Sequence, residues 1–280
     1  TIAFGALTGA AGEQALSVAN GNGYIMSVAS LDGDGTLIKA GGSRLEIQSI
    51  DPGFSGNIRI AGPSGLTLAP TFSSTTNSNL TLPATSNLTS FHVDGSYITE
   101  ASKTLNISGT LSVNANPGSG TNAHNVPGAL AVTSTTTLSA GTVVNNGSIG
   151  AAGGSATLTA SDSFRGQGIY QTNGQPLVLN GIAANDGATP TTLKVAGNNT
   201  VTLTRTGVGV DSTNTGGAQV QSGTFRILAT DDSTNPLGTG DIRVFGSPAS
   251  TASSTTAAIS AVSGTLHFDT DSGNNISQAG

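Results

Sequence analysis

Two aspartates separated by one glycine, Asp32 and Asp34, form the clearest candidate metal site in the chain. Residues 32–35 read Asp-Gly-Asp-Gly, and alternate carboxylates can face one ion, as at the start of a calcium-binding loop. An EF-hand would place acidic ligands at its ninth or twelfth position, where this sequence has Ala40 and Ser43. Calcium at Asp32 and Asp34 is therefore a hypothesis, and no other cofactor is expected. Comparable acidic turns contain Asp231 and Asp232, and Asp269 and Asp271.

A polysaccharide lyase or hydrolase is the enzyme class to weigh, and the sequence argues against it. Such an enzyme needs carboxylates or basic groups that converge on one face, and usually aromatic rings that hold sugars. The chain has no Trp, its histidines have no acidic or cysteine neighbours at metal-ligand spacing, and no G-x-S-x-G nucleophile turn is present. We therefore expect no enzyme activity. The residues considered are Tyr24, Tyr97, Tyr170, His92, His124 and His267.

The elements that must carry these side chains are indicated by a repeated phrase: glycine, then Ser or Thr, then an apolar–x–apolar triplet. Clear copies begin at Gly35, Gly109, Gly223 and Gly264. A tight turn followed by alternating apolar residues predicts a very short strand with one buried side. A unit this small cannot bury its apolar face alone, so the copies must stack on one another, as in a solenoid.

The fold expected from this phrase is an all-β solenoid over residues 1–280, with loop excursions. Rungs of about 20 to 25 residues would give roughly a dozen rungs. An irregular break is predicted near 114–128, a segment that contains Pro117 and Pro127. Disorder is the alternative for so polar a chain, but the low charge and the period-2 alternation argue against it. A conventional β-sandwich remains open as the other fold.

Composition limits the classes of partner. Charged residues make up 9% of the chain, the formal net charge is −6, and cysteine is absent. Nucleic acid is excluded as a partner because phosphate backbones require clustered positive charge. No apolar run approaches the length of a membrane-spanning helix. The lack of cysteine is compatible with export.

Two segments resemble the autotransporter-associated β-strand repeat of passenger domains and surface adhesins. Residues 31–47 match the family's G-x-G-x-L-x-K-x-G-x-G-x-L-x-L run, and residues 56–68 resemble the strand that follows it. Residues 197–227 form the second segment, and residues 235–244 resemble the family's L-G-x-G-x-I-x-V closing strand. The resemblance implies a right-handed parallel β-helix exposed on a bacterial cell surface, and it implies no catalytic residue.

The two ends of the stack are the expected assembly sites. Neither the first ten residues nor residues 272–280 contain an amphipathic or charged cap, so exposed strand edges there invite pairing. We expect head-to-tail association with further copies, or attachment to the cell surface or host matrix, in an extracellular structural or adhesive fibre. Two alternatives are ends that lie within a longer solenoid and a carbohydrate-binding or polysaccharide-degrading, tail-spike-like β-helix. The predicted assembly residues are Ile2, Phe4, Leu266, Phe268 and Ile276.

Overall fold

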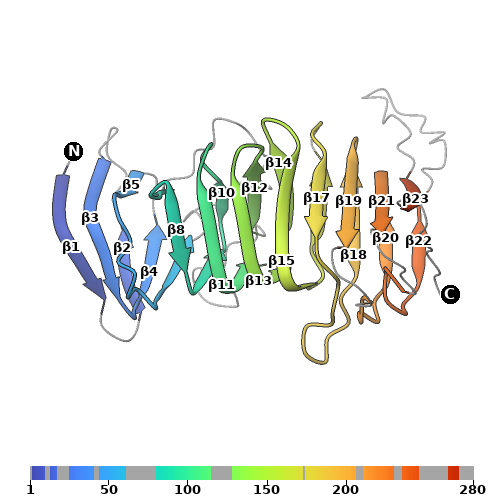
Figure 1. Cartoon of the computed structure of the whole chain (residues 1–280), viewed down its shortest axis with the longest axis horizontal. Helices are drawn as coiled ribbons and strands as arrows, with labels where there is room; N and C mark the ends of the chain where they lie inside the picture. The colour runs from blue at the N-terminus through green and yellow to red at the C-terminus, as the bar shows by residue number, and fades with distance from the viewer. Residues whose placement is uncertain are drawn as a thin grey trace, which may run out of the picture.

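The computed structural model describes ten stretches of the chain, and within them it consists of strands and turns with no helix. These stretches are residues 2–9, 13–17, 25–40, 44–60, 80–114, 128–172, 174–205, 211–229, 235–245 and 264–270. The strands lie side by side along the long axis of an elongated molecule, from β1 at one end to β22 and β23 at the other (Figure 1). The expectation of an all-β chain built from stacked short strands is confirmed at this level.

The strands form three sheets in which every strand pair is parallel. The first sheet contains β1 (Ile2–Gly9), β3 (Ile25–Gly33), β5 (Arg44–Ile47) and β7 (Leu80–Thr81). The seven-stranded sheet contains β10 (Ser96–Ile98), β12 (Ala129–Thr133), β14 (Ser148–Ala152), β16 (Ile169–Thr172), β18 (Leu193–Gly197), β20 (Ala218–Val220) and β22 (Ile242–Val244).

The twelve-stranded sheet runs through most of the described chain. It contains β2 (Glu13–Ser17), β4 (Thr36–Ala40), β6 (Asn57–Ile60), β9 (Ser90–Val93), β11 (Thr104–Val113), β13 (Thr137–Asn145), β15 (Ala156–Arg165), β17 (Leu177–Asn180), β19 (Thr200–Arg205), β21 (Gly223–Ala229) and β23 (Gly264–Thr270), with β8 (Thr85–Leu88) paired to β11. From β10 onward the chain alternates between this sheet and the seven-stranded one. Each return therefore adds one strand to each sheet.

Register is regular from β13 to β21 of the twelve-stranded sheet. Leu138, Leu158, Leu179, Leu203 and Ile227 are successive partners on neighbouring strands, so paired positions lie 20 to 24 residues apart. A constant inward position on each strand produces a continuous apolar column. This arrangement of long parallel sheets is compatible with a β-solenoid.

The three long strands β11, β13 and β15 share a shift of register, here called the bend, and in β11 it falls where the phrase predicts a turn. Gly109 was expected to open a strand, but it lies inside β11, at a shift of register between Ile107 and Thr110. The first half of β11 pairs with β8 and the second half with β9. Two short strands therefore lie beside successive halves of one long strand. Glycine is required at this bend for packing, because a Cβ on Gly141 of β13 would lie 2.7 Å from the Ser108 carbonyl oxygen.

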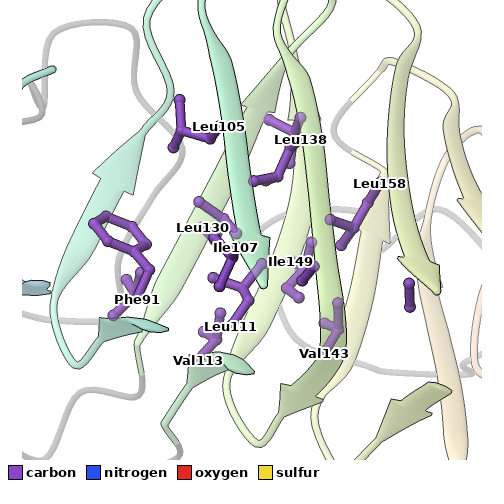
Figure 2. Close-up of a cluster of buried hydrophobic side chains, with 14 of the residues drawn as sticks. Phe91, Leu105, Ile107, Leu111, Val113, Leu130, Leu138, Val143, Ile149 and Leu158 are labelled. Atoms are coloured by element: carbon purple, nitrogen blue, oxygen red, sulfur yellow. The ribbon is translucent and has the colours of Figure 1, made fainter. Parts of the chain in front are cut away.

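The core is a narrow column of aliphatic side chains between the sheets (Figure 2). Leucine, isoleucine and valine from the inward positions of the strands are almost fully buried. Each such side chain contributes about 1.5 to 3 kcal/mol on burial, which explains how a chain with few hydrophobic residues can sustain a thin core. The core also contains two edge-to-face aromatic pairs. The ring centroids of Phe91 and Tyr97 lie 5.2 Å apart, and those of Phe164 and Tyr170 lie 6.2 Å apart.

The predicted break near 114–128 falls mostly outside the described residues, which end at Asn114 and resume at Gly128. The Gly128 N–H donates to the Asn114 carbonyl oxygen at 2.7 Å. Pairing continues across the gap, because β10 pairs with β12 and β11 with β13. Both sheets therefore pass through this region without interruption.

Candidate functional site

The end of the stack formed by β22 and β23 exposes three large apolar side chains, two of which would be core in a longer stack. Val244 is 47% exposed, Phe245 46% and Phe268 38%, and they are the large hydrophobic side chains found exposed in the described part of the molecule. Val244 continues the column of Val220, and Phe268 continues that of Ile227. Their exposure arises because the described strands place no further strand over this end.

The structure places the predicted assembly residues at opposite ends of the molecule. Leu266 and Phe268 lie on β23, and Leu266 packs partly against the core. Ile2 and Phe4 lie on β1, paired with Met26 and Val28 of β3 at the other end (Figure 1). Ile276 lies outside the described residues, so its assignment stays a prediction.

Sequence reasoning did not single out Val244 and Phe245 at this end. Residues 235–244 resemble the family's closing strand, and the structure has a strand, β22, over Ile242–Val244. The missing information was the strand register. The pairing of Val220 with Val244 shows that Val244 occupies an inward position, and no described strand covers it. The alternation of Ile242 and Val244 around Arg243 was the available signal.

One of the two carboxylates in the predicted calcium site already accepts a hydrogen bond from the neighbouring backbone. Asp32 lies near the end of β3, where its Oδ1 accepts the Gly33 N–H at 2.6 Å, and Asp34 is exposed in the turn that follows. Among the described residues no three His, Cys, Asp or Glu side chains gather as metal ligands would. Calcium binding here stays a prediction.

The other acidic turns are described only in part. Asp269 forms an ion pair with Arg226 of the neighbouring strand β21. Asp231, Asp232 and Asp271 lie outside the stretches that the structure covers.

A chain of hydrogen bonds on the outer face of the twelve-stranded sheet surrounds His92. Ser90 donates its hydroxyl to the Asn57 side-chain oxygen and therefore accepts from His92 Nε2, at 3.3 Å. In the neutral imidazole, His92 Nδ1 accepts the Ser112 hydroxyl at 2.5 Å. A neutral imidazole with its proton on Nε2 satisfies every hydrogen bond of this chain.

The surroundings of His92 favour the same neutral form. Burial lowers the pKa of His92, the Asp94 carboxylate opposes this, and the Arg59 guanidinium lowers it further. Asp94 is itself buried and accepts from Arg59 and Asn114. The cluster thus satisfies its buried charges internally.

Ser112 and His92 have the hydrogen bond of a nucleophile and its base, but the geometry does not suit catalysis. Ser112 is only 7% exposed, so a substrate carbonyl cannot approach its Oγ. Sequence analysis did not find the contact because the two residues are 20 positions apart and meet only through the register of β9 and β11. His267 faces solvent on β23, as its alternation with Leu266 predicted, and His124 lies beyond the described residues.

Comparisons with protein families, with curated proteins and with solved structures found no match. In the stretches that the structure describes, no helix has the length and hydrophobicity to cross a membrane.

Proposed function

We propose that this chain is a right-handed parallel β-helix of roughly a dozen rungs that acts as a structural or adhesive subunit on a bacterial cell surface. Its partners are further copies of itself, joined head to tail, and the cell surface or host matrix. The all-parallel sheets and the spacing of 20 to 24 residues between paired positions support this proposal. The resemblance of residues 31–47 and 197–244 to surface-exported repeats supports the location.

The observation that carries the proposal is the uncovered apolar end at β22 and β23. Val244 and Phe268 expose side chains in positions that are core elsewhere in the stack, and the exposed Phe245 lies beside Val244. An exposed strand edge with apolar side chains is a template for pairing with another chain.

A second copy of this chain is the occupant that fits the end best. The main path of the twelve-stranded sheet ends at β2 and β23, and all strand pairs along it are parallel. Moving one copy along the stack axis therefore places its β2 beside β23 of the next copy with the correct strand direction. Such a contact does not close on itself, so it generates a filament.

Sedimentation analysis over a range of concentrations tests the assembly. We expect the wild-type chain to form concentration-dependent oligomers and Phe268→Asp to remain monomeric, because a carboxylate at the centre of the new core would be buried without a partner. His267→Asp is the matched control, since it lies on the same strand and faces solvent. A wild-type monomer at every concentration, or equal assembly of both variants, would refute head-to-tail pairing.

Digestion of intact producing cells with an added protease tests the location separately. We expect the chain to be cleaved without lysis of the cells. Protection until the cells are lysed would contradict surface exposure.

A further inference from the structure

A hollow of about 480 Å³ lies on the outer surface of the twelve-stranded sheet, along the bend in its long strands. It crosses β8, β11, β13 and β15, and Phe54 from the turn before β6 closes it on one side. Its volume lies within the range of about 300 to 1,000 Å³ that is usual for ligand sites. Small residues at the bend, among them Ser108, Gly141 and Ser161, leave this space open.

Hydrogen-bonding side chains line the hollow in a column that follows the strand register. Asn87, Asn106, Ser139 and Thr159 are successive partners on the four strands. Ser139 donates to the Asn106 side-chain oxygen at 3.2 Å, and Asn106 donates to the Asn87 side-chain oxygen at 3.0 Å. Asn106 uses one of its two amide N–H groups in this chain and Asn87 uses only its oxygen, so both retain donors for a ligand.

Among the residues that the structure describes, the lining has no formal charge. Its remaining described members are apolar or small, including Leu88, Ile107 and Ala140, with no Asp, Glu, Lys, Arg or His. An anionic or cationic ligand would therefore lose its hydration without gaining an opposite charge. A ligand with many neutral hydroxyl groups and apolar ring faces suits this mixture of amides, hydroxyls and aliphatic side chains.

We propose that this hollow binds a short neutral oligosaccharide that lies along the axis of the stack. Four strands at about 4.8 Å spacing extend the hydrogen-bonding column over about 14 Å, enough for a few hexose rings in line. A peptide is a poorer fit, since extended peptides pair with the main chain of a strand edge, and three of the four strands here, β11, β13 and β15, are already paired on both sides. No described carboxylate lines the site, so we expect the bound glycan to be held and not cleaved.

The site goes beyond the proposed assembly and does not depend on it. It lies on β8 to β15, away from the end formed by β22 and β23 (Figure 1). The monomeric variant Phe268→Asp should therefore bind the glycan as the wild type does. Failure of assembly and failure of glycan binding can thus be told apart.

The experiment is a binding screen with an immobilised panel of neutral oligosaccharides derived from cellulose, dextran, mannan and galactan, together with polygalacturonate and heparin. Since Asn87 and Asn106 each begin an Asn-x-Ser/Thr sequon, the protein is produced in a bacterial host that does not glycosylate asparagine. We expect binding to at least one neutral glycan and none to the acidic polymers. Binding to the acidic polymers alone, or to none of the panel, would overturn the proposal.

Two variants on β15 locate the binding site. Thr159→Asp places a carboxylate in the hollow, and we expect about a tenfold or greater loss of affinity for the neutral glycan. Thr157→Asp introduces the same charge two positions earlier on the same face, outside the lining, and should bind within about twofold of the wild type. Circular dichroism and the thermal midpoint establish that both variants fold. Equal affinity of Thr159→Asp and the wild type would refute the site.

Discussion

Replacing Lys39 by methionine should stabilise the fold at neutral pH. Lys39 lies on β4, on the same side of the strand as Leu37, and is 1% exposed. Its register partner on β6 is Ile60, a core residue. Burial lowers the pKa of Lys39 from 10.5 to about 8, because the charged ammonium loses its hydration. Methionine has a similar length and no charge to desolvate.

The pH dependence follows from these two values. Between about pH 8 and pH 10.5 the unfolded chain holds the Lys39 proton and the folded chain does not, so stability rises with pH across this window. Below pH 8 both states are protonated and the folded state carries the full cost. The difference between the two pKa values corresponds to about 3 kcal/mol, which is the ceiling for the gain from Lys39→Met at pH 7.

Chemical denaturation followed by far-ultraviolet circular dichroism, at pH 7 and at pH 10.5, measures this effect. Lys39→Met should be more stable than the wild type at pH 7, and the gain should shrink to less than about 1 kcal/mol at pH 10.5. Lys194→Met is the control for loss of one positive charge, since the Lys194 amine lies half-buried and donates to the Gln167 carbonyl oxygen at 2.8 Å. An equal gain at both pH values, or a loss at pH 7, would refute the reasoning.

Three further predictions concern the stack itself. Leu158→Ala should lower the free energy of unfolding by about 2 to 5 kcal/mol in denaturant titrations, because Leu158 is fully buried and its removal leaves a cavity. Gly141→Ala should lower the thermal midpoint more than Gly153→Ala. A Cβ at Gly141 would lie 2.7 Å from a backbone oxygen, whereas Gly153 has φ +70° but open space around it. The opposite order of the two midpoints would contradict the bend geometry. Burial raises the pKa of Tyr97 and Tyr170, so above about pH 10 these two phenols ionise in the unfolded chain but not in the folded chain. The free energy of unfolding should therefore fall as the pH rises above about 10 in denaturant titrations. Tyr97→Phe should reduce that fall.

Much of the local structure could be predicted from the repeated glycine phrase. Strands occur at all four clear copies, because turn residues followed by alternating aliphatic side chains have few other ways to bury an apolar side. The bend at Gly109 could not be predicted, since its glycine is required by the approach of the Thr89 carbonyl oxygen, which would lie 2.8 Å from a Cβ. That oxygen belongs to the neighbouring rung, and a local pattern does not contain it.

The candidate sites depended even more on pairing between distant segments. Alternation alone predicted that His267 faces solvent, because this prediction needs only the side-chain directions within one strand. The contact of His92 with Ser112 and the column from Asn87 to Thr159 required the register of several strands, where a shift by one residue would reverse the side chains. The exposure of Val244 required knowing that no described strand covers it.

The spacing of 20 to 24 residues between paired positions has a consequence for how such a chain acquires its structure. From β13 to β21 each new strand closes a loop of nearly constant length, so the entropy of loop closure does not grow as this part of the stack lengthens. Ordering can start in any well-packed region and advance one turn at a time along the chain. A destabilised turn would halt that advance locally, and the segments on either side could remain folded. Growth of this kind suits a chain that emerges gradually, end first, from the machinery that makes or exports it.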